Sequence, residues 1–138
     1  MNRIVLCIGS NMEPKRRNVE DAIRWCSGLC GDIRCSSIYE TPEIHGIGAP
    51  YANAVLEAFT EYGYEDLNTL LKSYELRMGR DGHARQHGIV PIDVDIVLWN
   101  DEIIRPKDFR QSFFRIGFMA IEGQMADIKS LALNGKES

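Results

Sequence analysis

The chain has 138 residues, which suits a single folded domain (residues 1–138), and a net charge of −4, which excludes general binding to nucleic acid or to anionic membranes. No apolar run approaches the length of about 18 residues that a membrane span needs. Residues 1–8 are too short for a secretory leader, so we expect a cytoplasmic protein. We also expect a monomer or a weak dimer. The cysteines lack C-x₂-C spacing, which favours reduced thiols over zinc or disulfides; they are Cys7, Cys26, Cys30 and Cys35.

Residues 1–8 predict a first strand, and apolar residues at helical spacing predict an amphipathic helix over 14–29. Residues 32–39 and 51–60 are rich in β-branched and aromatic residues and predict two strands, joined by a long loop over 40–50. A second amphipathic helix is expected over 64–78, where an apolar stripe runs to the helix-ending Gly79.

The stretch 79–88 is polar and lacks periodicity, so it predicts a loop before a strand over 90–99 and a short strand at 103–104. The order is β-α-β-β-α-β, which predicts an α+β domain with a four-stranded, mainly antiparallel sheet. We expect the two helices to cover one face and to leave the other face free for ligands. The last ten residues are polar enough to fray, although Ile128, Leu131 and Leu133 could anchor a final turn.

Asp93 and Asp95 alternate with apolar residues in the strand over 90–99. Alternate residues of a strand point to the same face, so the two carboxylates stand about 6.6 Å apart along the backbone. Their mutual repulsion favours a compensating cation, and Mg²⁺ accepts one or two carboxylates and completes its shell with water and phosphate oxygens. The pair therefore points to phosphate chemistry; pairing with nearby arginines is the competing interpretation.

Five short segments follow one another along the chain: Ile8-Gly9-Ser10-Asn11, Ser36-Ser37-Ile38-Tyr39-Glu40-Thr41-Pro42, Tyr51-Ala52-Asn53-Ala54, Glu75 with Gly79-Arg80, and Asp93-Val94-Asp95. Together they resemble the folate-pathway enzyme family of 6-hydroxymethyl-7,8-dihydropterin pyrophosphokinases. The resemblance implies a ferredoxin-like fold and an ATP-dependent diphosphotransferase that passes pyrophosphate to the hydroxymethyl group of a reduced pterin and releases AMP. It also implies two Mg²⁺ ions with ATP, held by Asp93 and Asp95.

A flat pterin needs amides at the rim of its pocket and an aromatic face beneath its ring. The resemblance assigns substrate binding to six residues: Thr41, Pro42, Ile44, Tyr51, Asn53 and the stacking Phe118. The competing interpretations are that Asn53 is a turn or bulge residue, that the two aromatic residues belong to the core, and that the Thr-Pro pair only breaks a strand.

On the ATP side, the resemblance places Glu75 near the nucleotide, and Arg80 follows the helix stop where a guanidinium can bind triphosphate oxygens. The competing interpretations are a surface carboxylate on the helix and an Arg80–Asp81 ion pair in solvent. Both loops, 43–48 and 79–90, are expected to close over the reactants and exclude water.

The chain departs from the family where the ATP phosphates bind. Val90 stands where the family has an arginine, Arg110 replaces a histidine, and Ile116 occupies another arginine position, with Arg115 one residue away. In the loop 79–90, Gly82 and His87 replace an arginine and an aromatic residue. Substitute positive charge is expected from five residues, which are Arg85, Arg105, Lys107, Arg110 and Arg115; a solvated basic loop is the alternative.

Two function classes follow. The first is a Mg²⁺-dependent pyrophosphokinase with Asp93, Asp95 and Arg80 as catalytic residues, and Glu75, Arg80, Arg85, Arg110 and Arg115 as ATP ligands. The second is a catalytically weakened or inactive relative that binds a pterin or nucleotide. An RNA-binding sheet of similar topology is a poor third, because the acidic balance opposes it.

Overall fold

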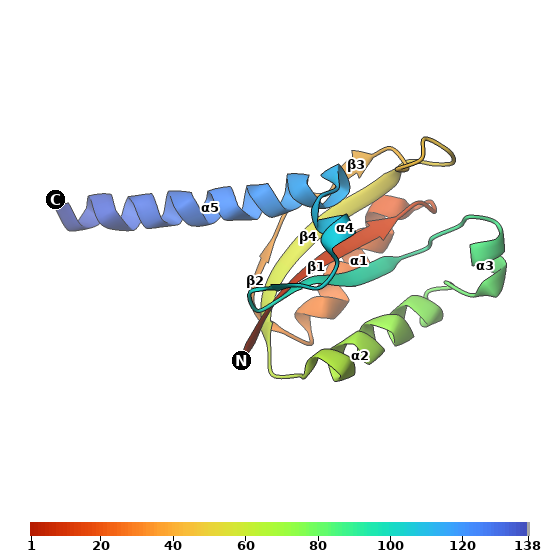
Figure 1. Cartoon of the computed structure of the whole chain (residues 1–138), viewed down its shortest axis with the longest axis horizontal. Helices are drawn as coiled ribbons and strands as arrows, with labels where there is room; N and C mark the ends of the chain where they lie inside the picture. The colour runs from red at the N-terminus through yellow and green to blue at the C-terminus, as the bar shows by residue number, and fades with distance from the viewer. Residues whose placement is uncertain (138) are drawn as a thin grey trace.

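The computed structural model describes the backbone of residues 1–137 and the side chains of residues 1–124 (Figure 1). The elements in chain order are β1 (Asn2–Ser10), α1 (Lys15–Ser27), β2 (Gly31–Cys35), β3 (Tyr39–Thr41), β4 (Tyr51–Thr60), α2 (Tyr64–Arg77), α3 (Gly82–Gln86), β5 (Asp93–Trp99), β6 (Glu102–Ile103), α4 (Pro106–Phe109) and α5 (Ser112–Glu137).

The sheet has strand order β2-β4-β1-β5-β6, with β3 as a further partner of β4, and its pairs are antiparallel. Strand β1 pairs with β4 along its whole length, from Asn2 opposite Thr60 to Ser10 opposite Ala52. Helix α1 connects β1 to β2, and α2 connects β4 to β5, which confirms the expected α+β, ferredoxin-like class. Over residues 1–137 the sheet has six strands rather than the expected four, because β2 and β3 form separately and the short β6 pairs with β5.

The first layer of the core lies between the sheet and helices α1 and α2. Ile4, Leu6 and Ile8 alternate along β1 and are fully buried against these helices. The matching helical residues recur at three- and four-residue spacing, which is why each helix buries one stripe; they are Val19, Ala22 and Cys26 of α1 and Leu67 and Leu71 of α2.

Helix α5 covers part of the opposite face, so the expectation that this face stays open is wrong for the half of the sheet where the helix lies. Val5 and Cys7 point to this side, and Phe114 and Ile121 of α5 pack with them and with Val55. Figure 1 shows α5 crossing β4 and extending past the sheet. The uncovered end of this face, beside the first turns of α4 and α5, is where a ligand can enter.

The expected strand over 32–39 is divided into β2 and β3 because Ser36 interrupts the backbone ladder. The Ser36 hydroxyl, rather than a carbonyl, accepts the Val55 N–H at 2.9 Å. Three helices were not expected: α3 within the polar loop, and α4 and α5 after β6. Ile128, Leu131 and Leu133 lie outside the described side chains. Within the described residues, no helix is both long and apolar enough for a membrane span.

Candidate active site

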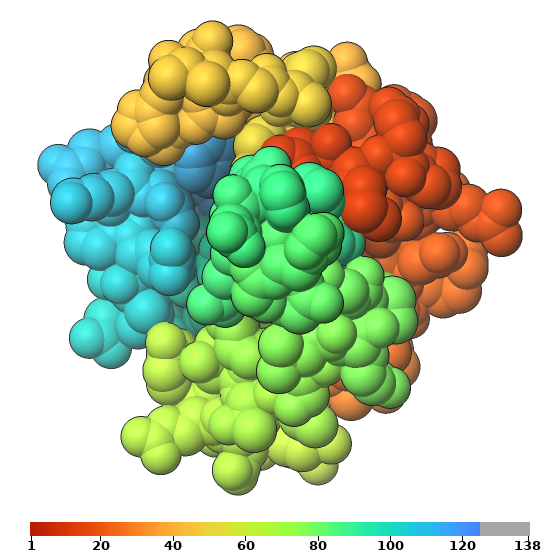
Figure 2. All heavy atoms as spheres, turned by 90° about the vertical axis from the view of Figure 1, so that its right-hand side faces the viewer, coloured from red at the N-terminus to blue at the C-terminus, as the bar shows by residue number. Residues whose placement is uncertain are grey.

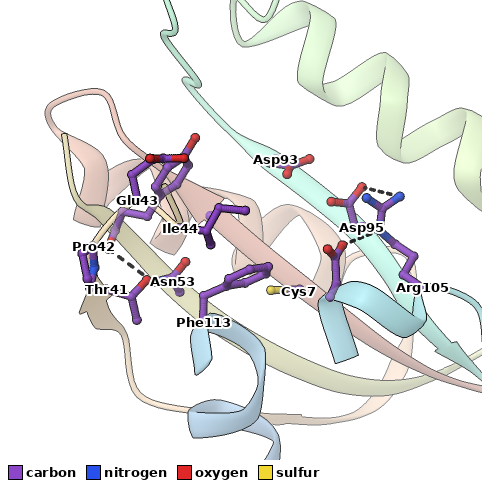
Figure 3. A pocket seen from close by; sticks show the side chains of 13 residues that line it. Cys7, Thr41, Pro42, Glu43, Ile44, Asn53, Asp93, Asp95, Arg105 and Phe113 are labelled. Carbon is purple, nitrogen blue, oxygen red and sulfur yellow. Dashed lines mark hydrogen bonds and ion pairs between the residues drawn. The ribbon is translucent and has the colours of Figure 1, made fainter. Parts of the chain in front are cut away.

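A cavity of about 210 Å³ opens at the uncovered end of the sheet. Figure 2 faces this end, where the segments around residues 45 (gold), 85 (green) and 108 (cyan) meet around a hollow. The lining residues come from strands β1, β3, β4 and β5, from helices α4 and α5, and from the loops beside them; they are Cys7, Gly9, Thr41, Pro42, Glu43, Ile44, Tyr51, Asn53, Asp93, Asp95, Arg105, Asp108 and Phe113 (Figure 3).

One side of the cavity carries a fixed amide. Asn53 is buried in β4, and its Nδ2 donates to Thr41 Oγ1 at 2.9 Å, to the Tyr39 carbonyl at 3.2 Å and to the Tyr51 carbonyl at 3.3 Å. These bonds hold the side chain in one orientation. No donor among the described residues reaches Asn53 Oδ1, so this oxygen is an acceptor that a ligand can use.

Five of the six residues predicted to bind substrate line the cavity: Thr41, Pro42, Ile44, Tyr51 and Asn53. The sixth, Phe118, does not, because its ring stacks on Phe114 with centroids 5.2 Å apart. Phe113, which sequence reasoning missed, supplies an aromatic ring at the cavity instead. The Tyr39 hydroxyl donates to the Phe113 carbonyl at 2.6 Å and thereby ties the first turn of α5 to β3.

Three carboxylates gather on the other side of the cavity. Asp93 and Asp95 lie on one face of β5, opposite Gly9 and Cys7 of β1, as the alternating pattern predicted. Glu75 of α2 joins them, and one oxygen from each of the three carboxylates lies within 4.8 Å of the others. Glu75 is only 4% exposed, so it is not a surface carboxylate of the helix.

Three cationic side chains compensate this acidic cluster. Arg80 Nη1 lies 2.6 Å from Asp93 Oδ1 and 3.0 Å from Glu75 Oε1, rather than pairing with Asp81 in solvent. Lys72 Nζ lies 2.9 Å from both Glu75 Oε2 and Asp95 Oδ1. Arg105 Nη1 is 3.9 Å from Asp95 Oδ1. The carboxylates are therefore paired with side chains in this state, as the competing interpretation of the aspartate motif held.

The pKa values of the two aspartates shift in opposite directions. Burial and the neighbouring Asp95 charge raise the pKa of Asp93 to about 7, although Arg80 opposes the shift. Burial also disfavours the charged form of Asp95, but the Lys72 ammonium outweighs it and lowers the Asp95 pKa. Asp95 therefore stays ionised over a wider pH range than Asp93.

The basic residues predicted to bind ATP lie apart from the cavity lining. Arg85 is exposed on α3, Arg110 is exposed with its Nε donating to the Pro106 carbonyl at 3.2 Å, and the Arg115 guanidinium lies 5.7 Å from the Phe109 ring centroid. Arg105 does line the cavity, with its Nε held by Asp108 Oδ2 at 2.5 Å. Lys72 was missed, although its position one helical turn before Glu75 was a usable signal.

Val90 and Ile116, which stand where the family has arginines, carry no charge. The Val90 N–H donates to Asn11 Oδ1 at 2.6 Å, and its carbonyl accepts the Asn11 N–H at 3.0 Å, which fixes the end of the loop before β5. Ile116 is half exposed on α5. The donor set at the cavity nevertheless suits a hard divalent ion, because carboxylate oxygens are the ligands that Mg²⁺ prefers.

Comparison with known proteins gives a consistent result. Among similar proteins, a folate synthesis bifunctional protein (mitochondrial) of Arabidopsis thaliana is 29% identical over 142 residues, covering 95% of this chain and 25% of the relative. A second protein of that name from Arabidopsis thaliana is 28% identical over 113 residues (76% and 23%), and a mitochondrial one from Pisum sativum is 31% identical over 105 residues (74% and 20%). The chain thus spans about a quarter or less of the length of these relatives.

Two of these relatives are named as mitochondrial, so the comparison does not assign a compartment to this chain.

A family model described as 7,8-dihydro-6-hydroxymethylpterin-pyrophosphokinase (HPPK) matches residues 5–123. This match spans the sheet, the cavity and the acidic cluster. The chain therefore belongs to the 7,8-dihydro-6-hydroxymethylpterin-pyrophosphokinase family.

Proposed function

We propose that this chain transfers the pyrophosphoryl group of ATP to the hydroxymethyl group of 6-hydroxymethyl-7,8-dihydropterin, with Mg²⁺, in folate biosynthesis. The observation that carries the proposal is the common cavity: the amide of Asn53 and the carboxylates of Asp93 and Asp95 line the same space. A group bound at Asn53 therefore meets a phosphate group bound near the aspartates.

The pterin half of the site is set by Asn53 and its neighbours. The Asn53 Oδ1 accepts from the donor edge of the pterin ring, while Thr41 and Tyr39 keep the amide oriented. Tyr51 and Phe113 offer aromatic surface for the flat ring. Asp93 and Asp95 lie across the cavity from Asn53 (Figure 3), so a hydroxymethyl group that points away from Asn53 meets the acidic side.

The phosphate half depends on Asp93 and Asp95, which are the residues that hold Mg²⁺. The bound ion supplies charge neutralisation and polarisation of the phosphate oxygens. Arg80 has donors to spare, because its buried Nε has no hydrogen-bond partner among the described residues. We assign Arg80 and Arg105 to the triphosphate oxygens, where guanidinium groups bind in a fork geometry.

In the reaction the hydroxymethyl oxygen forms a bond to the β-phosphorus, and the bond between the β-phosphorus and the α,β-bridging oxygen breaks, so AMP departs. The site residues contribute mainly by positioning both reactants and by balancing charge. The loop over 43–48 and helix α3 lie beside the hollow in Figure 2 and can exclude water on closing.

Product analysis by ³¹P nuclear magnetic resonance tests the proposal. The folded protein with ATP, Mg²⁺ and the reduced hydroxymethylpterin is expected to form AMP and a pterin diphosphate in equal amounts. Omission of any one of the three reactants serves as the control. Formation of neither product by correctly folded protein contradicts the proposal, as does AMP formation that is independent of the pterin.

The second candidate is a pterin-binding protein without catalysis. Its support is the uncharged side chains of Val90 and Ile116 at family arginine positions and the ion pairs that occupy Asp93 and Asp95. Calorimetry separates the two candidates. Pterin binding without measurable affinity for an ATP analogue in Mg²⁺ favours the binder, whereas tight analogue binding favours the enzyme.

A further inference from the structure

The ammonium group of Lys72 is a cation at the acidic cluster, and contacts within the fold fix its position. Its ammonium has three N–H donors and three acceptors, which are Asp95 Oδ1 at 2.9 Å, Glu75 Oε2 at 2.9 Å and the Val94 carbonyl at 3.1 Å. All three donors are therefore used, and none is free for a phosphate group.

Lys72 also bonds to the backbone at the free edge of β5. At Asp93 to Asp95, β5 has β1 on one side only, since β6 pairs with it at Leu98 and Trp99. Glu75 accepts the Val94 N–H at 2.8 Å, and Lys72 donates to the Val94 carbonyl, so two side chains of α2 replace a neighbouring strand. Moving Lys72 away breaks this edge interaction as well as the ion pairs.

Arg80 contrasts with Lys72 in its bonding. Arg80 uses Nη1 for Asp93 and Glu75, while its buried Nε has no partner within the described residues. A guanidinium with unused donors gains hydrogen bonds by turning to a phosphate, and Asp93 Oδ1 is then released. An ammonium with three satisfied donors gains none, so Asp95 Oδ1 stays bound to Lys72.

The fixed charge of Lys72 then limits the number of metal ions. Asp93 and Asp95 together carry two negative charges when both are ionised, and the Lys72 ammonium, 2.9 Å from Asp95 Oδ1, offsets one of them. A second divalent ion at the aspartates would meet this ammonium as well as the first ion, and like charges at short range repel. One bridging ion is accommodated, because Mg²⁺ needs only one or two carboxylates beside phosphate oxygens and water.

We propose that Lys72 is a built-in cation that takes the place of one of the two divalent ions, so that the nucleotide-loaded protein holds one ion rather than two. The inference rests on the proposed function, because it places Mg²⁺ and nucleotide at the aspartates. It makes Lys72 a positioning residue that sets metal stoichiometry.

The test uses Mn²⁺ as the probe metal and an ATP analogue with a methylene group between the α- and β-phosphorus. Electron paramagnetic resonance and calorimetry count the ions bound per protein–analogue complex. The wild-type protein is expected to bind one Mn²⁺, without the spectral broadening of two neighbouring ions. Lys72→Gln and Lys72→Met are expected to bind two and to produce that broadening.

Two variants complete the design. Lys72→Arg keeps the charge and is expected to retain one ion. Arg77→Gln removes one positive charge from the same helix, where Arg77 lies over the Trp25 ring, and is also expected to retain one ion. The thermal melting of each variant establishes that it is folded, and the outcome is read from any Lys72 variant that melts cooperatively.

Two Mn²⁺ ions in the wild-type complex overturn the role of Lys72 and leave the proposed function intact. One ion in the wild type and in every folded Lys72 variant also overturns it, because the stoichiometry is then set elsewhere. Absence of both metal and analogue binding in the wild type refutes the proposed function itself, and with it the inference.

Discussion

The buried Glu75 carboxylate accepts the backbone N–H of Val94 at 2.8 Å, so a side chain of α2 takes the place of a strand beside β5. Through this one contact the helix, the sheet edge and the acidic cluster are coupled. Glu75 simultaneously binds Lys72 and Arg80, and these cations reach Asp95 and Asp93. The stability of the fold and the geometry of the proposed metal site therefore depend on the same carboxylate.

Glu75→Ala is expected to lower the free energy of unfolding by about 3 kcal/mol, because it leaves the buried Val94 N–H without an acceptor and removes one ion-pair partner from both Lys72 and Arg80. Glu75→Gln retains one acceptor oxygen and is expected to cost about 1.5 kcal/mol. Urea denaturation measures both. Glu65→Ala, exposed in the first turn of the same helix, is the control and is expected to cost less than about 1 kcal/mol. Equal losses in Glu75→Ala and Glu65→Ala contradict this prediction.

Gly117→Ala is expected to loosen the docking of α5 on the sheet. A Cβ at Gly117 lies 2.7 Å from Val55 Cγ2 and 2.8 Å from the Tyr39 hydroxyl, closer than packing allows. We expect a loss of about 2 kcal/mol in the free energy of unfolding.

Gly123→Ala is the matched control in the same helix, because a Cβ there has nothing within 4 Å. Alanine is the better helix former, so this variant is expected to gain about 0.5 kcal/mol. Denaturation of both variants under identical conditions measures whether Gly117→Ala loses stability and Gly123→Ala gains it. A Gly117→Ala protein as stable as the wild type contradicts the account of how α5 is held.

The raised pKa of Asp93, about 7 because of burial and the Asp95 charge, predicts two pH effects. First, protonated Asp93 is a poor metal ligand, so Mn²⁺ affinity with the ATP analogue rises as the pH increases from about 6 to about 8. Second, the folded state binds this proton more tightly than the unfolded chain, so the Asp93 contribution to stability is lost as the pH rises from about 4 through about 7. The shift of Asp95 is opposite in sign, and its contribution is lost in acid.

Thermal melting of the wild type and of Asp93→Asn across this range separates the contribution of Asp93 from that of other groups. Asp93→Asn cannot titrate at this position, so its stability is expected to change less between pH 4 and pH 7 than that of the wild type. Identical pH profiles for the two proteins contradict the assignment of the raised pKa to Asp93.

Asn53→Ala is expected to raise the KM for the pterin about tenfold, since it removes the free acceptor Oδ1 and the bonds that order Thr41. The affinity for the ATP analogue is expected to stay unchanged, because Asn53 lies on the other side of the cavity from the aspartates. Steady-state kinetics and calorimetry measure the two quantities. An unchanged KM in a folded variant excludes Asn53 from pterin recognition.

Much of the fold was predictable because its long strands are apolar runs and its first two helices are amphipathic. The apolar run of β1, the alternating aspartates of β5 and the apolar stripes of α1 and α2 match the expected elements to within a few residues. The division between β2 and β3 was not predictable, because it depends on Ser36 bonding to Val55, a residue distant in sequence. Helices α4 and α5 did have signals, namely Pro106 at a first helical turn and the apolar spacing from Phe114 to Ile121.

The site was predictable where a motif lies on a regular element. Asp93 and Asp95 face one way because they alternate on a strand, and Asn53 faces them because β4 pairs with β1 in a fixed register. The cationic partners were harder, since Lys72 meets Asp95 only after α2 packs beside β5. Phe113, rather than Phe118, reaches the cavity because the Tyr39 contact sets the start of α5.

The central claim is that the aspartate pair and the amide-lined end of one cavity together support pyrophosphoryl transfer. The most direct measurement is the rate of AMP formation from ATP, Mg²⁺ and 6-hydroxymethyl-7,8-dihydropterin by the wild type and by Asp95→Asn. The account predicts pterin-dependent AMP formation that Asp95→Asn lowers at least about 100-fold, because a metal ligand is lost. Equal rates in the two folded proteins, or no AMP from the wild type, would contradict it.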